Sequence, residues 1–172
     1  MTRRNLLFGG LAALGAGAAA KLLTGSSRAG ADEEMPGTAE KAAFEVSRSE
    51  EEWRRMLNPA QYRVLREHGT ESPGSSPLDK EYRAGTYHCT GCDLPLFSST
   101  TKFDSGTGWP SFWAPLDDAV GTTEDRTLFF MVRTEVHCRR CGGHLGHVFE
   151  DGPPPTGLRY CMNGVSLRFV AA

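Results

Sequence analysis

The sequence predicts a mainly β domain, a compact twisted antiparallel β-barrel or sandwich with helices at its N-terminal side. Twenty glycines and ten prolines among 172 residues indicate many turns and short elements rather than long helices. Several short segments rich in β-branched and aromatic residues follow one another after residue 78, with Gly or Pro between them. The composition, 39% hydrophobic and 23% charged, is that of a globular chain, and the length suits one domain.

Residues 1–31 have the layout of an export signal. A basic start with Arg3 and Arg4 precedes a Leu/Ala/Gly-rich apolar run, and Ala29-Gly30-Ala31 has the form of an A-x-A cleavage site. The paired arginines favour the twin-arginine route, although "TRRNLL" keeps only part of that motif. The apolar run contains Lys21, which disfavours a stable membrane span. An uncleaved anchor helix is the alternative.

This leader predicts a bacterial protein that is exported to the periplasm and meets the membrane only during export, or stays anchored there if the leader is not cleaved. Residues 1–31 hold four of the 19 basic residues and none of the 21 acidic ones, so the remainder has 15 basic and 21 acidic residues and a formal net charge of −6. No basic stripe with interleaved aromatics gives electrostatic support for nucleic-acid binding. We expect a monomer.

Two helices are expected at the start of the mature domain, which we place at residues 48–172. Residues 32–47 are polar and unpatterned, and they are interpreted as a flexible linker. Ser49 before "EEEWRRML" is typical of a capped helix start, with acids in the first turn and arginines later. Asn58 as N-cap with Pro59 at the first helical position starts a second helix, and Gly69 is expected to stop it.

The β segments follow a turn-rich stretch over 70–78. They are expected in the pieces "GTYHC", "PLFSS", "TLFFMVRTEVHC", "HLGHVF" and "VSLRFV". A rigid "PPPTG" loop comes shortly before Cys161. Their short length and the turn residues between them favour antiparallel pairing over crossover connections.

Four of the five cysteines form two C-x₂-C pairs, Cys89 with Cys92 and Cys138 with Cys141. Two such knuckles supply four thiolates, the ligand set of a closed structural zinc site with no open position for chemistry. The 45 residues between the pairs indicate that one Zn²⁺ joins two turns of a larger domain. The alternative is two disulfides, which an exported protein can form, although a disulfide within C-x-x-C is strained.

The fifth cysteine, Cys161, is then the one thiol left without a metal. Arg159 lies two residues before it, on the same face if the segment is a strand, and a guanidinium there favours the thiolate. His144 and His147 in "GGHLGHVFEDG" are candidate proton donors, and Asp151 is a candidate to orient one of them. A buried structural cysteine, with the histidines as surface or spare ligand residues, is the alternative.

Longer motifs add a resemblance to these residues. "KFDSGTGWPSF", "CRRCGGHLGHVFEDGPPPTGLRYCMN" and the two C-x₂-C pairs together resemble the methionine sulfoxide reductase B family, from about Glu50 to Phe169. The resemblance implies a twisted antiparallel β-core and a repair enzyme that reduces the R epimer of methionine sulfoxide in oxidised proteins.

The resemblance also implies roles for individual residues. Cys161 matches the nucleophile, and His144 and His147 match the pair that binds or protonates the sulfoxide oxygen. Trp109 matches the aromatic residue that holds the substrate methyl group, and Asn163 matches a further polar contact. Asp151 and Arg159 match supporting polar residues, Phe112 and Phe149 are expected to line the pocket, and the four paired cysteines match a structural zinc site, Cys89, Cys92, Cys138 and Cys141.

One position departs from many relatives. Where they have "SGCGW", this chain has "SGTGW", so Thr107 stands in place of the resolving cysteine. The sequence therefore predicts a one-cysteine cycle, in which a thioredoxin-like dithiol or a small thiol attacks the Cys161 sulfenic acid directly. The alternative, in which a zinc cysteine resolves it, would cost the fold its metal.

Two rival functions remain from the sequence. A zinc-stabilised binding module accounts for the paired cysteines but has no use for Cys161, Trp109 and the two histidines as a set. An enzyme acting on another oxidised thioether, or on free methionine sulfoxide, uses the same residues. Cys161-dependent turnover of methionine sulfoxide separates the first rival from the enzyme.

Overall fold

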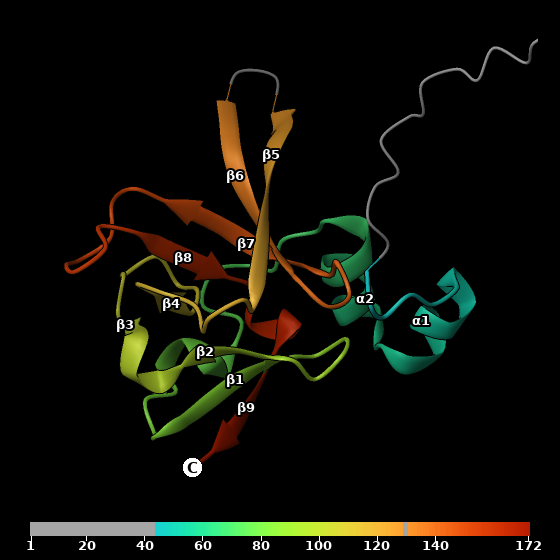
Figure 1. Ribbon diagram of the computed structural model, residues 1–172, viewed down its shortest axis with the longest axis horizontal. Coiled ribbons are helices and arrows are strands. Elements are labelled where there is room, and N and C mark those ends of the chain that lie inside the picture. The colour runs from blue at the N-terminus through green and yellow to red at the C-terminus, as the bar shows by residue number, and fades with distance from the viewer. Residues whose placement is uncertain (1–43, 129–130) are drawn as a thin grey trace, which may run out of the picture. The chain divides into compact units, whose positions relative to one another are not determined.

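The computed structural model describes residues 44–128 and 131–172 (Figure 1). The expected export signal at 1–31 and most of the expected linker lie outside the described residues. Within the described ranges, no helix is long and apolar enough to cross a membrane. The domain is mainly β with two antiparallel sheets and two N-terminal helices, which confirms the expected fold class.

The two helices start where the sequence predicts. The first, α1 (Glu50–Met56), is capped by Ser49, whose side chain accepts a hydrogen bond from the backbone N–H of Glu52 while the Glu52 carboxylate accepts one from Ser49. The second, α2 (Pro59–Glu67), has the same reciprocal cap between Asn58 and Gln61. Each cap satisfies backbone donors that the first helical turn would otherwise leave unpaired.

The end of α2 differs from the expectation. His68, rather than Gly69, takes the left-handed conformation that terminates the helix, with φ at 53°. Gly69 follows it and donates its backbone N–H to the Arg63 carbonyl at 2.9 Å. The glycine therefore helps to close the cap, while the histidine makes the turn.

In the part of the chain that the structure describes, nine strands form two sheets, and every adjacent pair is antiparallel. The three-stranded sheet has the order β2-β1-β9, with β1 at Gly85–Cys89, β2 at Pro95–Ser98 and β9 at Leu167–Ala171. The six-stranded sheet has the order β3-β4-β8-β7-β6-β5, with bounds Lys102–Phe103, Ser111–Phe112, Arg159–Met162, His144–Phe149, Met131–Cys138 and Val120–Leu128 respectively. Single 3₁₀ turns lie at Pro77–Lys80, Ser99–Thr101 and Gly164–Ser166.

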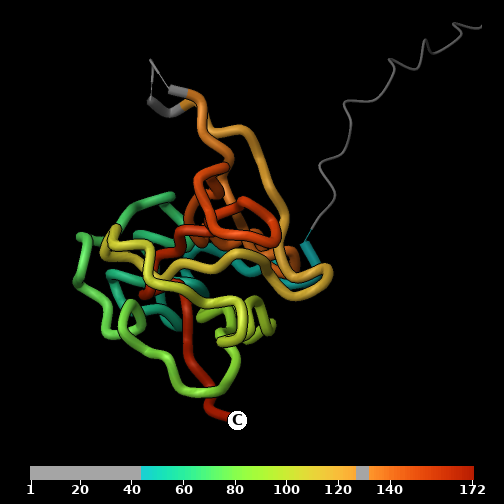
Figure 2. Tube along the Cα trace, turned by 90° about the vertical axis from the view of Figure 1, so that its left-hand side faces the viewer, coloured from blue at the N-terminus to red at the C-terminus, as the bar shows by residue number. Residues whose placement is uncertain are grey.

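The segment expected as one strand, "TLFFMVRTEVHC", is divided between two. β5 ends at Leu128 and β6 begins at Met131, so the apolar run belongs to both arms of a hairpin. Most of β5 was not predicted from the sequence, because "VGTTEDR" is polar and its apolar residues do not alternate. In Figure 2 this hairpin and the C-terminus lie at opposite ends of the domain.

The core is aromatic at its centre. Phe112 stacks on Phe97 with ring centroids 4.4 Å apart, and Tyr87 meets Phe112 edge-on at 4.9 Å. All three are fully buried, and burial of a side chain of this size contributes roughly 1.5–3 kcal/mol. Trp53 from α1 and Leu65 from α2 join the same core, which fixes the helices against the sheets. β7 and β8, which carry His147 and Cys161, lie side by side in the middle of the larger sheet.

The last residues of the expected linker contact the domain. Val46 donates its backbone N–H to the Arg140 carbonyl at 3.0 Å, and Glu45 pairs with Arg139 at 2.8 Å. Phe44 meets the His137 ring at 5.8 Å. Residues 44–47, which the sequence assigned to the linker, therefore lie against the segment that carries the second cysteine pair.

Candidate active site and candidate metal centre

The two C-x₂-C pairs converge on one point. Cys89 ends β1 and Cys138 ends β6, and each begins a tight turn in which a backbone N–H returns to the cysteine carbonyl at 2.8–2.9 Å. Left-handed residues complete the turns, Asp93 in the first and Gly142 in the second. The four sulfur atoms lie within 4.8 Å of one another.

These distances fit a zinc ion. Zn–S bonds of about 2.3 Å in a tetrahedron require sulfur atoms about 3.8 Å apart. Cys89 Sγ lies 3.7 Å from Cys141 Sγ, and Cys92 Sγ lies 3.5 Å from Cys138 Sγ. All five cysteines are free, and a disulfide would need sulfurs about 2.05 Å apart, so neither disulfide of the alternative is present. The cluster is suited to a metal held by four thiolates.

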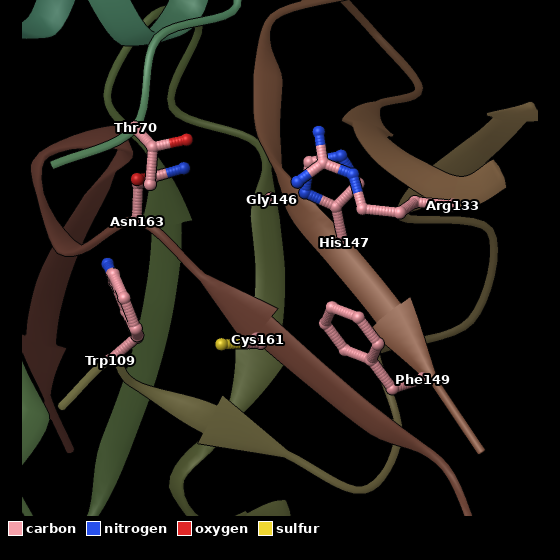
Figure 3. Close-up of a pocket in the computed structure, with 8 residues that line it drawn as sticks. All are labelled: Thr70, Trp109, Arg133, Gly146, His147, Phe149, Cys161 and Asn163. Atoms are coloured by element: carbon pink, nitrogen blue, oxygen red, sulfur yellow. The ribbon is translucent and has the colours of Figure 1, made fainter. Parts of the chain in front are cut away.

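A separate cavity of about 130 Å³ opens beside Cys161 (Figure 3). The sulfur of Cys161 lies between Trp109 and Phe149 in this view, with His147 and Arg133 above them. Strand pairing brings these residues together, because Cys161 on β8 is the register partner of His147 on β7 and of Ser111 on β4. The remaining lining residues are Thr70, Gly146 and Asn163.

Hydroxyl groups surround the Cys161 sulfur. Thr107 Oγ1 lies 3.8 Å from it, and Ser105 Oγ joins Thr107 Oγ1 at 2.8 Å and Ser111 Oγ at 2.7 Å. Burial raises the pKa of the Cys161 thiol above its ordinary value, and the Thr107 hydrogen bond and the Arg159 charge oppose this only in part. The guanidinium therefore acts in the expected direction, but burial outweighs it.

Asp151 lies elsewhere than the sequence suggested. Both of its carboxylate oxygens accept from Arg159, from Nε and from Nη2 at 2.8 Å each, and this guanidinium also lies 4.4 Å from the centre of the Phe149 ring. Asp151 is exposed and contacts neither histidine. It orients Arg159 instead, because a planar guanidinium takes a carboxylate in a two-point contact.

The histidines bind two carboxylates that the sequence reasoning missed. His147 Nε2 lies 2.8 Å from Asp125 Oδ2, and His144 Nδ1 lies 2.7 Å from Glu135 Oε1. Asp125 lies on the part of β5 that was not predicted as a strand, and Glu135 lies on β6, in the segment expected as a single strand. The correct hairpin would have revealed Glu135, since it is the register partner of His147.

A bulge explains how the two histidines face the same way. Residues three apart on a regular strand point to opposite faces, but the β6–β7 register shifts between Val136 and His137. Leu145 is the extra residue on β7. With it in place, the ring centroids of His144 and His147 lie 5.4 Å apart, edge to face. His144 is only 2% exposed and lines a second cavity together with Asp125, Glu135 and His147, whereas His147 lines both cavities.

Asn163 and Trp109 are both held by Glu71, which the sequence reasoning did not single out. The backbone of Glu71 donates its N–H to Asn163 Oδ1 at 2.9 Å and accepts from Trp109 Nε1 at 3.3 Å. Its carboxylate accepts the N–H groups of Gly164 at 2.6 Å and Val165 at 3.0 Å. This one residue therefore links the tryptophan to the chain that follows Cys161.

Phe112 does not line the cavity beside Cys161, contrary to the expectation. Neighbouring residues on a strand point to opposite faces, and Ser111 takes the face toward the thiol. Phe112 is turned into the core, fully buried against Phe97. The other aromatic candidates, Trp109 and Phe149, do line the cavity.

Comparison with known proteins places this chain in a family. Residues 57–171 match the family model described as the SelR domain. Relatives named "Peptide methionine sulfoxide reductase MsrB" include those of Pseudomonas putida (strain W619), 59% identical over 72% of this chain and 93% of the relative, and of Agrobacterium fabrum, 54% identical over 72% and 92%. That of Leptospira interrogans is 52% identical over 73% of this chain and 96% of its own length.

Proposed function

The chain belongs to the SelR, or methionine sulfoxide reductase B, family, and from this premise we propose that it reduces the R epimer of methionine sulfoxide in proteins. The observation that carries the proposal is the placement of Cys161. It is the one cysteine outside the four-sulfur cluster, and it faces a cavity that Trp109 and His147 also line.

Substrate binding is proposed to use both kinds of lining residue. A methionine sulfoxide side chain is apolar at its methyl group and polar at its oxygen. The flat faces of Trp109 and Phe149 suit the methyl group and the polarizable sulfur. The polar side, with His147 and Arg133, suits the oxygen. A cavity of about 130 Å³ is small, which favours an unbranched side chain over a bulky one.

The proposed reaction begins with attack of the Cys161 thiolate on the sulfoxide sulfur. As the sulfur–oxygen bond of the substrate breaks, a proton passes to the oxygen from a nearby imidazole, for which His147 is the best placed. Methionine leaves as the thioether, and Cys161 keeps the hydroxyl group as a sulfenic acid. The sulfoxide is thereby reduced by two electrons and the cysteine is oxidised by two.

Return of Cys161 to a thiol is proposed to need an external reductant. A first thiol attacks the sulfenic sulfur, releases water and forms a mixed disulfide, and a second thiol then frees Cys161. Thr107 supports this cycle, because its hydroxyl lies 3.8 Å from the sulfur at the position where many relatives carry a resolving cysteine. A thioredoxin-like dithiol supplies both thiols from one molecule.

One structural Zn²⁺ is proposed at Cys89, Cys92, Cys138 and Cys141. When bound, it joins the turn after β1 to the turn after β6, and with four thiolate ligands it keeps no open position for catalysis. The cluster then stabilises the domain and takes no part in the reaction. This also removes the four cysteines as resolving thiols.

Turnover of stereochemically defined substrates tests the proposal. Wild type and Cys161→Ser are compared on peptide-bound R and S methionine sulfoxide with dithiothreitol as reductant. We expect reduction of the R epimer by wild type and none by the variant. Turnover that survives the substitution, or absence of turnover in zinc-loaded wild type, would leave only a metal-stabilised binding module.

The reductant cycle is tested separately. The protein is oxidised with substrate in the absence of reductant, and its free thiols are counted after denaturation and zinc chelation. We expect four free thiols and one sulfenic acid trapped by dimedone. An intramolecular disulfide that contains Cys161 contradicts the one-cysteine cycle without affecting the assignment of the reaction.

Export by the twin-arginine route to the periplasm is proposed from the leader sequence, with cleavage after Ala31. The test expresses the chain in bacteria and sequences the N-terminus of the protein in the periplasmic fraction. We expect a mature chain beginning at Asp32, and we expect Arg3→Lys with Arg4→Lys to keep the precursor in the cytoplasm. A full-length chain in the membrane fraction supports the anchor alternative.

A further inference from the structure

We propose that Asp125 and Glu135 are positioning residues for the reaction at Cys161. Each carboxylate holds one imidazole of the His144/His147 pair by one ring nitrogen. At His147, which lines the cavity beside Cys161, this leaves the other nitrogen for the sulfoxide oxygen and its proton. This inference rests on the proposed function, because it concerns how that reaction receives its proton.

Asp125 contacts both His147 and Arg133. Asp125 Oδ2 lies 2.8 Å from His147 Nε2 and 2.6 Å from Arg133 Nη2, so the carboxylate sits between a guanidinium and an imidazole. All three side chains are largely buried, which makes their contacts strong and their geometry fixed. A carboxylate at Nε2 selects the tautomer with its proton on Nε2, so Nδ1 receives the second proton when the ring becomes a cation.

Glu135 contacts His144 in a similar way, but through Nδ1 rather than Nε2. Glu135 Oε1 lies 2.7 Å from His144 Nδ1, and His144 Nε2 is buried without a hydrogen-bond partner among the residues that the structure describes. A buried imidazole nitrogen without a partner costs free energy unless a ligand or water supplies one. The carboxylate also contacts His68 Nδ1 at 3.0 Å, and His68 is exposed at the end of α2.

The groups around His147 shift its pKa in opposite directions. Burial disfavours the His147 cation most, Asp125 from β5 favours it, and Arg133 from β6 and His144 on the same strand disfavour it. The result is a His147 pKa below the ordinary value, opposite in direction to that of Cys161 on β8. Glu135 contacts both His144 and His68. Without Asp125, the pKa of His147 would fall further.

These directions fix the sign of the pH dependence. The reacting form needs a cationic imidazole and a thiolate, and the imidazole has the lower pKa of the two. Between the two pKa values the fraction in this form is small and constant. Below the imidazole pKa the rate falls as the thiolate is lost, and above the thiol pKa it falls as the cation is lost. Lowering the imidazole pKa therefore moves the acidic limb to lower pH and reduces the plateau.

The test measures kcat/KM against pH for wild type, Asp125→Asn and Glu135→Gln with the R epimer of a peptide methionine sulfoxide. We expect Asp125→Asn to move the acidic limb to lower pH and to reduce the plateau by roughly tenfold per pH unit moved, with little change in KM. Glu135→Gln is expected to act in the same direction but less, since His144 does not line the cavity beside Cys161.

Glu50→Gln is the matched control. Glu50 Oε1 accepts a hydrogen bond from Arg54 Nη2 at 2.8 Å on α1, so the change also removes a carboxylate paired with a cation, but Glu50 lines neither cavity described above. We expect its pH profile to match that of wild type.

A second measurement does not depend on substitution of the carboxylates. In Cys161→Ser protein with ¹⁵N-labelled histidines, we expect neutral His147 to carry its proton on Nε2 and neutral His144 on Nδ1. The opposite tautomers would overturn the inference, and so would an unmoved acidic limb in folded Asp125→Asn and Glu135→Gln. If wild type reduced no sulfoxide, the proposed function would fail, but the tautomers would still report on the contacts.

Discussion

Two groups of cysteines in this domain show how surroundings decide the chemistry of sulfur. Around Cys89, Cys92, Cys138 and Cys141, each sulfur has other sulfurs within 4.8 Å. The Cys161 sulfur instead has a hydroxyl beside it, Thr107 Oγ1 at 3.8 Å. The first arrangement suits a metal with a filled coordination shell, and the second leaves a lone sulfur facing a cavity.

The two groups also differ in what holds them. The cluster lies at the ends of strands, in two turns that each contain a left-handed residue. Cys161 lies inside a sheet, with strand partners on both sides. We therefore expect changes at the cluster to affect stability first, and changes around Cys161 to affect activity first.

The largest expected effect is at the cluster. Cys141→Ser removes a buried ligand and with it most of the metal affinity, so the free energy of unfolding should fall by more than about 4 kcal/mol. Thermal unfolding followed by circular dichroism, with zinc content measured on the same samples, checks this. Cys161→Ser is the control and should keep both its zinc and its unfolding temperature. Equal losses in the two variants would remove the distinction between the groups.

The next effect concerns the strand pairing beneath Cys161. A Cβ atom on Gly146 would lie 2.1 Å from the Cys161 carbonyl oxygen, which is backbone and cannot move without separating β7 from β8. Gly146→Ala should lower the free energy of unfolding by about 3 kcal/mol and weaken turnover in the protein that remains folded. Chemical denaturation and kcat/KM give the two values.

A control for Gly146→Ala is Gly106→Ala, at a position where a Cβ meets nothing within 4 Å but φ is +70°. That change introduces backbone strain without a clash, so it should cost about 1 kcal/mol. If Gly106→Ala destabilised the domain as much as Gly146→Ala, close approach of the backbones would not explain the effect.

A third change would give Cys161 a sulfur neighbour of its own. Thr107→Cys places a thiol near the Cys161 sulfur, at the separation from which a disulfide forms with small adjustments. After one turnover without reductant, peptide mapping should show a disulfide between residues 107 and 161, and the sulfenic acid should no longer be trapped. Ser105→Cys is the matched variant, because Ser105 contacts Thr107 and Ser111 rather than the Cys161 sulfur. A trapped sulfenic acid in both variants would show that position 107 cannot resolve.

How much the sequence could predict follows the same division. The helix caps at Ser49 and Asn58 and the two cysteine knuckles are local patterns, and each was found where expected. The partners of the histidines were not, because Asp125 and Glu135 approach them through strand pairing and a bulge that no local pattern records. Asp151 is nearer to His147 in sequence but lies past the end of β7, where Arg159 holds it. Proximity along the chain therefore misled where register decides the neighbours.

Phe112 shows the same limit in another form. Its place in the motif suggested that Phe112 lines the cavity. On the two-residue strand β4, however, Ser111 and Phe112 point to opposite faces, and only one of them can contact Cys161. The aromatic residue belongs to the core because Phe97 and Tyr87 surround it. A motif of this length records which residues are close, but the strand fixes which way each one points.

The smallest expected effect lies in the hydroxyls that replace sulfur around Cys161. Thr107→Val keeps the shape of the side chain and removes its hydrogen bond to the Cys161 sulfur, which opposes the rise in pKa caused by burial. The pKa of Cys161 should therefore rise further, and alkylation by iodoacetamide should slow a few-fold at any pH below that pKa. Above it both proteins are thiolates and should react at the same rate, so the high-pH arm serves as an internal control. A constant difference across the whole pH range would mean that the substitution altered access to the sulfur, and the hydroxyls would then have no part in the difference between the two groups of cysteines.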